Sequence, residues 1–274
     1  MLDCTIYVIT HKKTVIPEIN GYKPLLVGAD KNDNFMNDYL KDNTGEHISE
    51  KNNSYCELTG LYWIWRNTND AYSGLVHYRR YFAFVRKKFI YRGRFIVKST
   101  ENAYKILDKN DISKLLNGYD MLVKQKDWRL RNNRYIFTIV LGKECINWIE
   151  QTIFRNYADY YDLLKKIEKK HTHLNCNMFI GKKEIVDKYC EWLFSVLEDI
   201  DQLHIKKYGE RYCNREMGYI GELLFEVWLK RNNIKYRIVS VVNTEDKTAL
   251  NGVMDCKEFM EFFFSKILYK LRKT

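Results

Sequence analysis

Short apolar segments alternate with longer amphipathic segments along most of the chain. The apolar segments have the length of buried strands, and the amphipathic ones carry apolar residues at the spacing of a helix face. The predicted strands span residues 5–10, 24–28, 75–77, 119–124, 173–180 and 236–242, and the predicted helices span residues 55–66, 111–116, 144–170, 182–200 and 217–231. This alternation predicts one α/β domain over residues 1–243, with a mostly parallel or mixed central sheet flanked by helices.

Residues 244–274 are predicted to form a separate C-terminal tail. On a helical wheel, its large apolar side chains fall on one side and its charged side chains on the other. The apolar side consists of Phe259, Phe262, Phe263, Ile267 and Leu271. A basic amphipathic helix of this kind is typical of a membrane-surface anchor. The alternative is that the apolar stripe packs onto the domain or onto a partner.

The composition narrows the class of partner. The chain has a formal net charge of +11, with 46% hydrophobic and 15% aromatic residues. This excludes a disordered protein and indicates an anionic partner, which could be nucleic acid, a lipid surface or a phosphorylated small molecule. The seven cysteines show no CxxC spacing, and we interpret them as reduced thiols of a cytosolic protein. Neither a signal peptide nor an apolar run of about 20 residues, enough to span a bilayer, is expected.

The predicted strand at residues 75–77 ends in a cluster of basic and aromatic side chains, His77, Tyr78, Arg79 and Arg80. In open α/β sheets, ligands bind beyond the carboxyl ends of the strands. Guanidinium groups match phosphate oxygens in pairs, and aromatic rings suit a flat base or a sugar. These residues therefore predict a site for a diphosphate that is attached to a base or a sugar. The alternative is a solvated basic turn.

A second polar segment lies at residues 171–180. In a strand with period two, His171, His173, Asn175 and Asn177 share one face, opposite an apolar face. Two imidazoles and two amides on one face favour the wall of a sugar-binding cleft. Two histidines spaced by one residue can also hold a metal, which would favour a metal hydrolase. The third interpretation is an ordinary edge strand with a wet face.

The predicted helix at residues 217–231 carries Glu222 on a side that also has apolar residues. A partly buried carboxylate there could act as a general base, since desolvation raises its pKa. The alternative is an ion pair with a residue such as Arg215. Glycine-rich phosphate loops and a GxSxG motif are absent from the sequence, which argues against a dinucleotide oxidoreductase, a P-loop NTPase and a serine hydrolase of that kind.

Several segments together resemble a known bacterial family. The most specific are ISEKNNSYCELTGLYWIWR at 48–66 and GLVHYRRY at 74–81. Further matches are IYVITHK at 6–12, VGA at 27–29, YD at 119–120, NMFI at 177–180, YCEWL at 189–193, and Arg215 with Gly218 and Glu222. Over roughly residues 4–240, the chain resembles bacterial capsular and exopolysaccharide glycosyltransferases long filed under a domain of unknown function. Some of these are linked to galactofuranosyl transfer.

The resemblance implies a GT-A-like domain that uses a nucleotide-sugar, with a UDP-linked donor expected. Many such transferases carry a metal-binding Asp-x-Asp motif at a place comparable to residues 77–80. We therefore expect fixed cations to replace the divalent ion, so that no metal is essential. The expected donor-binding residues are Thr10, His11, Gly28, Ala29, Glu50, Lys51, Asn52, Tyr55, His77, Tyr78, Arg79 and Arg80.

The same resemblance implies roles in catalysis and in acceptor binding. Glu222 is the expected base, with Glu57 and Asp120 as rivals, and Arg79 and His77 are expected to assist the leaving diphosphate. The expected acceptor-binding residues are His173, Asn175 and Asn177. The predicted function is sugar transfer, with galactofuranose a candidate, to a lipid-linked or oligosaccharide acceptor of a surface polysaccharide, at the inner face of the cell membrane. The alternative is a non-catalytic module that binds anionic glycan or nucleic acid.

Overall fold

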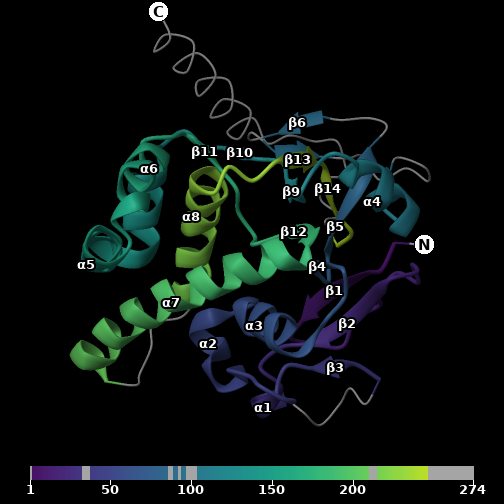
Figure 1. Cartoon of the computed structure of the whole chain (residues 1–274), viewed down its shortest axis with the longest axis horizontal. Helices are drawn as coiled ribbons and strands as arrows, with labels where there is room; N and C mark the ends of the chain where they lie inside the picture. The colour runs from purple at the N-terminus through teal and green to yellow at the C-terminus, as the bar shows by residue number, and fades with distance from the viewer. Residues whose placement is uncertain are drawn as a thin grey trace, which may run out of the picture.

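The computed structural model describes residues 2–32, 38–85, 89–91, 94–96, 104–209 and 215–245. Its centre is a ten-stranded sheet (Figure 1). The strands of this sheet are β1 Cys4–Thr10, β2 Tyr22–Leu26, β3 Leu40–Lys41, β4 Tyr72–His77, β5 Arg80–Val85, β8 Tyr104–Ile106, β9 Met121–Lys124, β12 Phe179–Lys182, β13 Tyr236–Val239 and β14 Val241–Asn243. Two further strand pairs are β6 Phe89–Tyr91 with β7 Arg94–Ile96, and β10 Asp127–Trp128 with β11 Thr172–His173.

The strand directions decide which side chains meet at one edge of the sheet. The main order is β13-β9-β12-β4-β1-β2-β3, and β5 links β4 to β8 and β14. Neighbours β1, β2, β3 and β4 are parallel, as are β9 and β13, whereas β12 is antiparallel to both β4 and β9. The start of β12 therefore lies at the edge where β1, β2, β4 and β9 end. The predicted fold class, an α/β domain with a mostly parallel mixed sheet, is confirmed.

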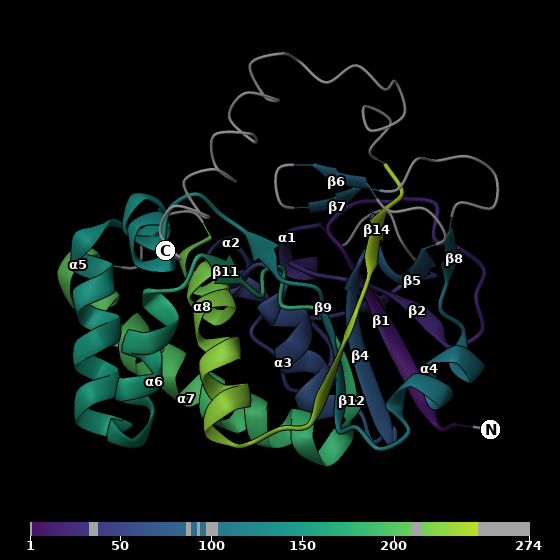
Figure 2. The same cartoon turned by 90° about the horizontal axis from the view of Figure 1, so that it is seen from above.

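Helices cover the two faces of the sheet unequally. The helices are α1 Ala29–Asn32, α2 Asn52–Tyr55, α3 Leu58–Asn67, α4 Lys109–Leu116, α5 Asn133–Asn156, α6 Ala158–Glu168, α7 Lys183–Tyr208 and α8 Glu216–Arg231, with a short 3-10 helix η2 Ser49–Lys51. Figure 2 shows α3, α7 and α8 on one side of β1, β4 and β12, and α4 with β5, β8 and β14 on the other. Each face has its own buried apolar cluster, the larger one under the helices.

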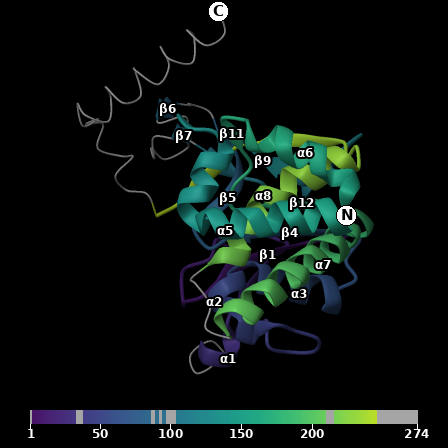
Figure 3. The same cartoon turned by 90° about the vertical axis from the view of Figure 1, so that its left-hand side faces the viewer.

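The helices α5 and α6 form an outer layer against α7 and α8 (Figure 3). The sequence predicts a helix that begins at residue 144, but α5 begins earlier, at Asn133. The reason is a cap, because the side chain of Asn132 accepts a hydrogen bond from the Tyr135 N–H. At Gly142 the backbone leaves the helical conformation, with φ of 83°, so α5 consists of two pieces.

Two predicted elements are broken in the structure, and both breaks lie next to charged residues. The predicted helix 55–66 is interrupted at Cys56, whose φ and ψ are 51° and −125°. Its carbonyl accepts hydrogen bonds from the Asn52 side chain and from the Thr59 backbone N–H, which holds the break open. The predicted strand 173–180 is interrupted where Cys176 and Asn177 have φ of 72° and 45°. The predicted alignment of four polar side chains on one strand face is therefore wrong, and His173 and Asn177 are buried.

The predicted tail stays a prediction, because residues 246–274 lie outside the described residues. No helix in the described part of the chain combines the length and the apolar character needed to cross a membrane. None of the five described cysteines forms a disulfide, and the expected reduced state stays a prediction.

Candidate functional site

The carboxyl edge of the sheet gathers most of the residues that the sequence singles out. Thr10 ends β1, His77 ends β4, and Cys176 with Asn177 precedes β12. Backbone hydrogen bonds tie the loops together, since Tyr78 N–H donates to Ile9 and Val27 N–H donates to Thr10. This edge therefore brings the ends of β1, β2 and β4 into one region, as the sequence predicts for a ligand site.

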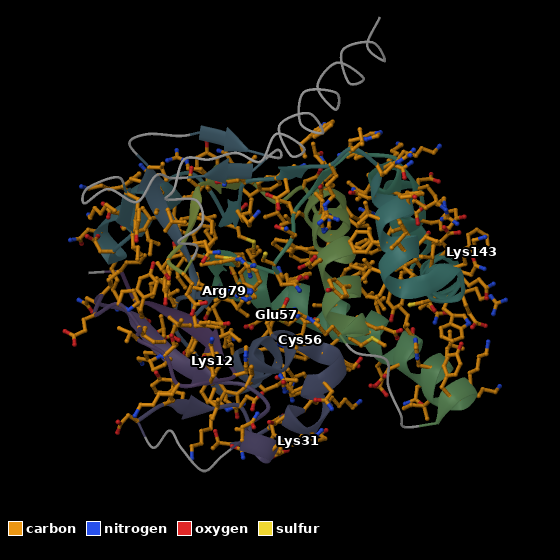
Figure 4. All side chains as sticks on the ribbon, turned by 180° about the vertical axis from the view of Figure 1, so that it is seen from behind. Lys12, Lys31, Cys56, Glu57, Arg79 and Lys143 are labelled. Carbon is orange, nitrogen blue, oxygen red and sulfur yellow. The ribbon has the colours of Figure 1, made fainter. Side chains whose placement is uncertain are left out.

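Two cations flank an aromatic ring at this edge. The ammonium of Lys12 lies 4.9 Å and the guanidinium carbon of Arg79 lies 5.5 Å from the centre of the Tyr78 ring. The carboxylate of Glu245 lies 3.9 Å from Lys12 and 3.8 Å from Arg79. Figure 4 shows Lys12 and Arg79 in the same region as Cys56 and Glu57. All three charged side chains are between 39% and 50% exposed, so the ion pairs are weak and open to exchange.

A buried carboxylate shapes the end of β2. Asp42 is fully buried and accepts hydrogen bonds from the backbone N–H groups of Gly28 and Ala29, at 3.0 and 3.1 Å. The hydroxyls of Ser49 and Thr59 donate to the same carboxylate, at 2.5 and 2.6 Å. Gly28 has φ of 65°, and a Cβ there would meet the side chain of Asn52 at 2.8 Å. The predicted donor residues Gly28, Ala29 and Asn52 therefore lie together around Asp42.

Several residues near the carboxyl edge of the sheet have strained backbone conformations. Among the described residues, the non-glycine positions with positive φ are Cys56, Cys176, Asn177, Arg215 and Asn233. The first four surround Glu57 and Glu222, whereas Asn233 lies at the end of α8. Such conformations cost about 1–3 kcal/mol each and cluster at functional sites. The strain points to the surroundings of the two carboxylates as the chemical centre.

The two carboxylates are held in different ways. Glu222 accepts a hydrogen bond from the Cys176 N–H at 2.7 Å with one oxygen, and its other oxygen lies 3.7 Å from Nε2 of His173. Burial alone would raise the pKa of Glu222, but the attraction of His173 and the Cys176 N–H hold it below its usual value. Glu57 accepts one hydrogen bond, from Asn177 Nδ2 at 2.8 Å, and its second oxygen receives none from the described residues.

His77 is neutral rather than cationic at this edge. Its Nε2 donates to the Cys176 carbonyl at 2.7 Å, and burial lowers its pKa below 6.5 despite the opposing charge of Glu57. Because a carbonyl only accepts, the proton resides on Nε2. The expectation that His77 contributes positive charge is therefore not supported. The permanent cations in the described part of this region are Lys12, Arg79, Arg80 and Arg215.

We expect acidification from pH 7.5 to about 5 to destabilise the fold. The unfolded chain protonates His77 near pH 6.5, whereas the folded chain does so at a lower pH. The stability contributed by neutral His77 is thus full above about 6.5 and falls as the pH drops, by up to about 1.4 kcal/mol per pH unit. His11 contributes to the pH dependence of stability in the same direction, because burial and the charge of Lys12 lower its pKa. Melting temperatures across this range should fall less steeply for His77→Gln, and equal slopes would contradict the assignment.

Some predicted site residues lie elsewhere. Lys51 and Tyr55 both contact the buried carboxylate of Asp201 on α7, at 3.1 and 3.2 Å. Asp120 lies at the start of β9, the opposite edge of the sheet, and pairs with Lys182. This excludes it as a rival base at the same site.

The predicted acceptor residues each contact a different carboxylate. Asn175 donates to Asp127 at 2.6 Å, while Asn177 and His173 contact Glu57 and Glu222. The expected pair of Glu222 with Arg215 is replaced by the contact with His173. His171 hydrogen-bonds backbone carbonyls of the loop before α5, so it does not share a metal site with His173.

Glu50 remains at the surface. It lies 3.7 Å from His47, and together with Asp30 these side chains could hold a divalent ion, since their ligand atoms lie within 4.8 Å of one another. All three are at least partly exposed, and exposed acidic groups commonly lie close together without a metal.

Sequence reasoning missed the roles of Lys12, Asp42 and Cys56. Lys12 lies two residues after the end of a predicted strand, and this position is a usable signal. Asp42 lies in a polar loop and Cys56 inside an apolar helix pattern, so no local pattern marks either of them. Only the three-dimensional arrangement brings them to the site.

Comparison with known proteins places the chain in a family. A family model described as a domain of unknown function, DUF4422, matches residues 5–233. The chain belongs to the DUF4422 family. This DUF4422 chain is also similar to the apo structure of the WbbM bifunctional glycosyltransferase, with a TM-score of 0.74 and 26% sequence identity. The match covers 92% of this chain and 47% of that one, so the chain spans about half the length of WbbM.

The comparison confirms the resemblance to a glycosyltransferase-like family filed under a domain of unknown function. A search of curated proteins found no match to this DUF4422 chain.

Proposed function

We propose that this DUF4422 protein is a glycosyltransferase that moves a sugar from a nucleoside diphosphate donor to an acceptor in surface polysaccharide synthesis. The likeness to WbbM, a bifunctional glycosyltransferase, supports sugar transfer. A UDP-linked donor is the first to test, with galactofuranose as the first sugar. The acceptor is an oligosaccharide or a lipid-linked sugar, and the enzyme works at the inner face of the cell membrane.

The observation that carries this proposal is the position of Glu245. Its carboxylate lies between Lys12 and Arg79, beside the Tyr78 ring. An anionic group of the chain itself thus occupies a place where two cations converge at the end of β4. A donor diphosphate would displace Glu245 and receive the same two cations, with stronger paired hydrogen bonds from the guanidinium. The strand ends that hold Gly28 and Ala29 then face the nucleoside.

Fixed cations would also assist the departure of the diphosphate. Positive groups aimed at the place where negative charge develops lower the barrier without a metal ion. Lys12 and Arg79 supply this charge, and Arg80 and Arg215 lie in the same region. Transfer should therefore persist in EDTA. Loss in EDTA with recovery by manganese would contradict this part of the proposal.

The geometry favours Glu57 over Glu222 as the base that deprotonates the acceptor. One oxygen of Glu222 accepts a backbone N–H, and the other faces the imidazole of His173 at 3.7 Å, so this carboxylate is paired with a potential cation. Glu57 keeps one oxygen without a hydrogen bond from the described residues, while Asn177 fixes the other. A general base needs an oxygen within reach of the acceptor hydroxyl. Glu222 would then position the Cys176–Asn177 turn that holds Glu57.

Arg79→Ala should weaken donor binding and turnover together. The guanidinium would contact the diphosphate both in the bound donor and as it leaves, so we expect Kd for UDP to rise by roughly 10- to 100-fold. The matched control is Lys143→Ala, which removes an exposed cation on α5, away from this edge (Figure 4). Equal loss of UDP binding in both variants would show a general effect of net charge and would contradict the assignment.

A screen of nucleotide-sugars tests the function itself. Purified protein is incubated with UDP-, GDP-, dTDP- and CMP-linked sugars, with and without EDTA, and nucleotide release is measured with simple sugar acceptors. We expect release from one nucleotide class, with UDP favoured. No release from any donor, together with salt-sensitive binding of any polyanion, would instead support a non-catalytic binding module.

A further inference from the structure

Three potential metal ligands meet inside the helical layer, away from the sheet edge. Cys145 is on α5, His204 on α7, and Glu216 in the first turn of α8. All three residues are buried, with 3%, 3% and 7% exposed. Their ligand atoms lie within 4.8 Å of one another. Neither the donor region nor the proposed reaction uses this cluster.

The chemistry of the three side chains suits a borderline-soft divalent cation. Thiolate, imidazole and carboxylate are all zinc ligands, and three of them with a water molecule complete a tetrahedral shell. A thiolate and a carboxylate together balance the two positive charges of the ion, so the buried site would carry no net charge. Burying ionisable groups without such compensation is costly.

The local geometry also points to a shared centre. Oε2 of Glu216 lies 2.6 Å from Nε2 of His204. Metal–ligand lengths of about 2.0–2.3 Å place two ligands of one zinc about 3.2–3.8 Å apart. Side-chain rotation that widens the contact between His204 and Glu216 and brings Cys145 closer would meet these lengths. The Trp148 ring packs edge-on against His204, with centroids 4.8 Å apart, and fixes the imidazole plane.

We propose that Cys145, His204 and Glu216 form a zinc site that joins α5, α7 and α8. The metal would fix the start of α8 directly beside Arg215, whose N–H donates to the Asn53 carbonyl. The metal would therefore link the outer helices to the strained turns around Glu57. It does not depend on the proposed glycosyl transfer, since the metal would neither touch the donor nor enter the reaction.

Metal analysis of the purified full-length protein tests the proposal. We expect about one zinc per chain. After removal of zinc by a chelator, zinc at about 100 times its Kd should raise Tm by about 5–10 °C, and magnesium should not. Cobalt in place of zinc should give a thiolate-to-cobalt charge-transfer band in the near ultraviolet.

The variants assign the ligands. Cys145→Ala should lose the charge-transfer band and the zinc-dependent rise in Tm, whereas Cys190→Ala, a buried cysteine on α7, should keep both. If Cys145→Ala does not fold, the cobalt spectrum and the zinc-dependent rise in Tm of the wild type still show whether the zinc site exists. Absence of zinc, of the band and of the Tm response in the wild type would overturn the site. A charge-transfer band that persists in Cys145→Ala would also overturn the site.

Adding back zinc or manganese to chelator-treated protein distinguishes the proposed zinc site from a metal requirement in the donor region. Recovery of chelator-treated protein by zinc points to the α5–α7–α8 cluster, because a thiolate and an imidazole suit zinc. Recovery of transfer by manganese, which prefers oxygen ligands, points to the donor region instead.

Discussion

Glu57→Gln should lower turnover by about 10³-fold while UDP affinity changes little. The glutamine keeps the size of the side chain and can still accept from Asn177 Nδ2, but it cannot take a proton from the acceptor hydroxyl. The fold should be retained, because the one hydrogen bond of Glu57 is preserved. Steady-state transfer rates and UDP titrations of the purified variant measure the two effects separately.

Glu222→Gln is the matched comparison for this result. It removes the charge that faces His173 but leaves an oxygen for the Cys176 N–H. We expect turnover to fall by less than about 10-fold, together with a lower melting temperature. If Glu222→Gln loses about 10³-fold while Glu57→Gln stays active, the base is Glu222, the residue first suggested by the sequence.

Asp42→Asn should destabilise the protein and weaken donor binding. The carboxylate of Asp42 accepts four hydrogen bonds, from two backbone N–H groups and two hydroxyls. An amide turns one acceptor into a donor, so at least one buried donor loses its partner. We expect a loss of about 3 kcal/mol in the free energy of unfolding, and a fall in Tm of about 6–12 °C. Thermal melts and UDP titrations measure the outcome.

Asp30→Asn is the control for this substitution. Asp30 lies on α1 beside the same strand end, but its side chain is exposed. We expect a change in Tm of less than about 1 °C for this variant. Equal melting temperatures of Asp42→Asn and wild type would show that Asp42 does not organise the end of β2.

Much of the fold follows from local patterns. The strands β1, β4 and β9 are short buried runs, and their apolar character is visible in the sequence. The long helices α7 and α8 begin within one residue of their predicted starts because their apolar stripes are regular. The basic cluster after β4 was predicted for the same reason, since it follows an abrupt end of an apolar run.

The chemical centre could not be predicted in the same way. Cys56 and Asn177 fit helix and strand patterns locally, yet both have positive φ. The Asn52 side chain donates to the Cys56 carbonyl, and the Asn177 side chain donates to the carbonyl of Gly218, which is distant in sequence. The buried state of His173 depends on α5 and α8, which are far away in sequence. Periodicity reports which face of an element is apolar, but not where tertiary contacts override it.

Calorimetric titration of the wild type and of Arg79→Ala with UDP, UMP and uridine tests the central claim most directly. The claim is that Lys12 and Arg79 grip a nucleoside diphosphate beside Tyr78. We predict saturable UDP binding that weakens stepwise for UMP and uridine, and a loss in Arg79→Ala that is large for UDP and negligible for uridine. No saturable UDP binding by the wild type, or equal affinity of the variant for UDP, would contradict it.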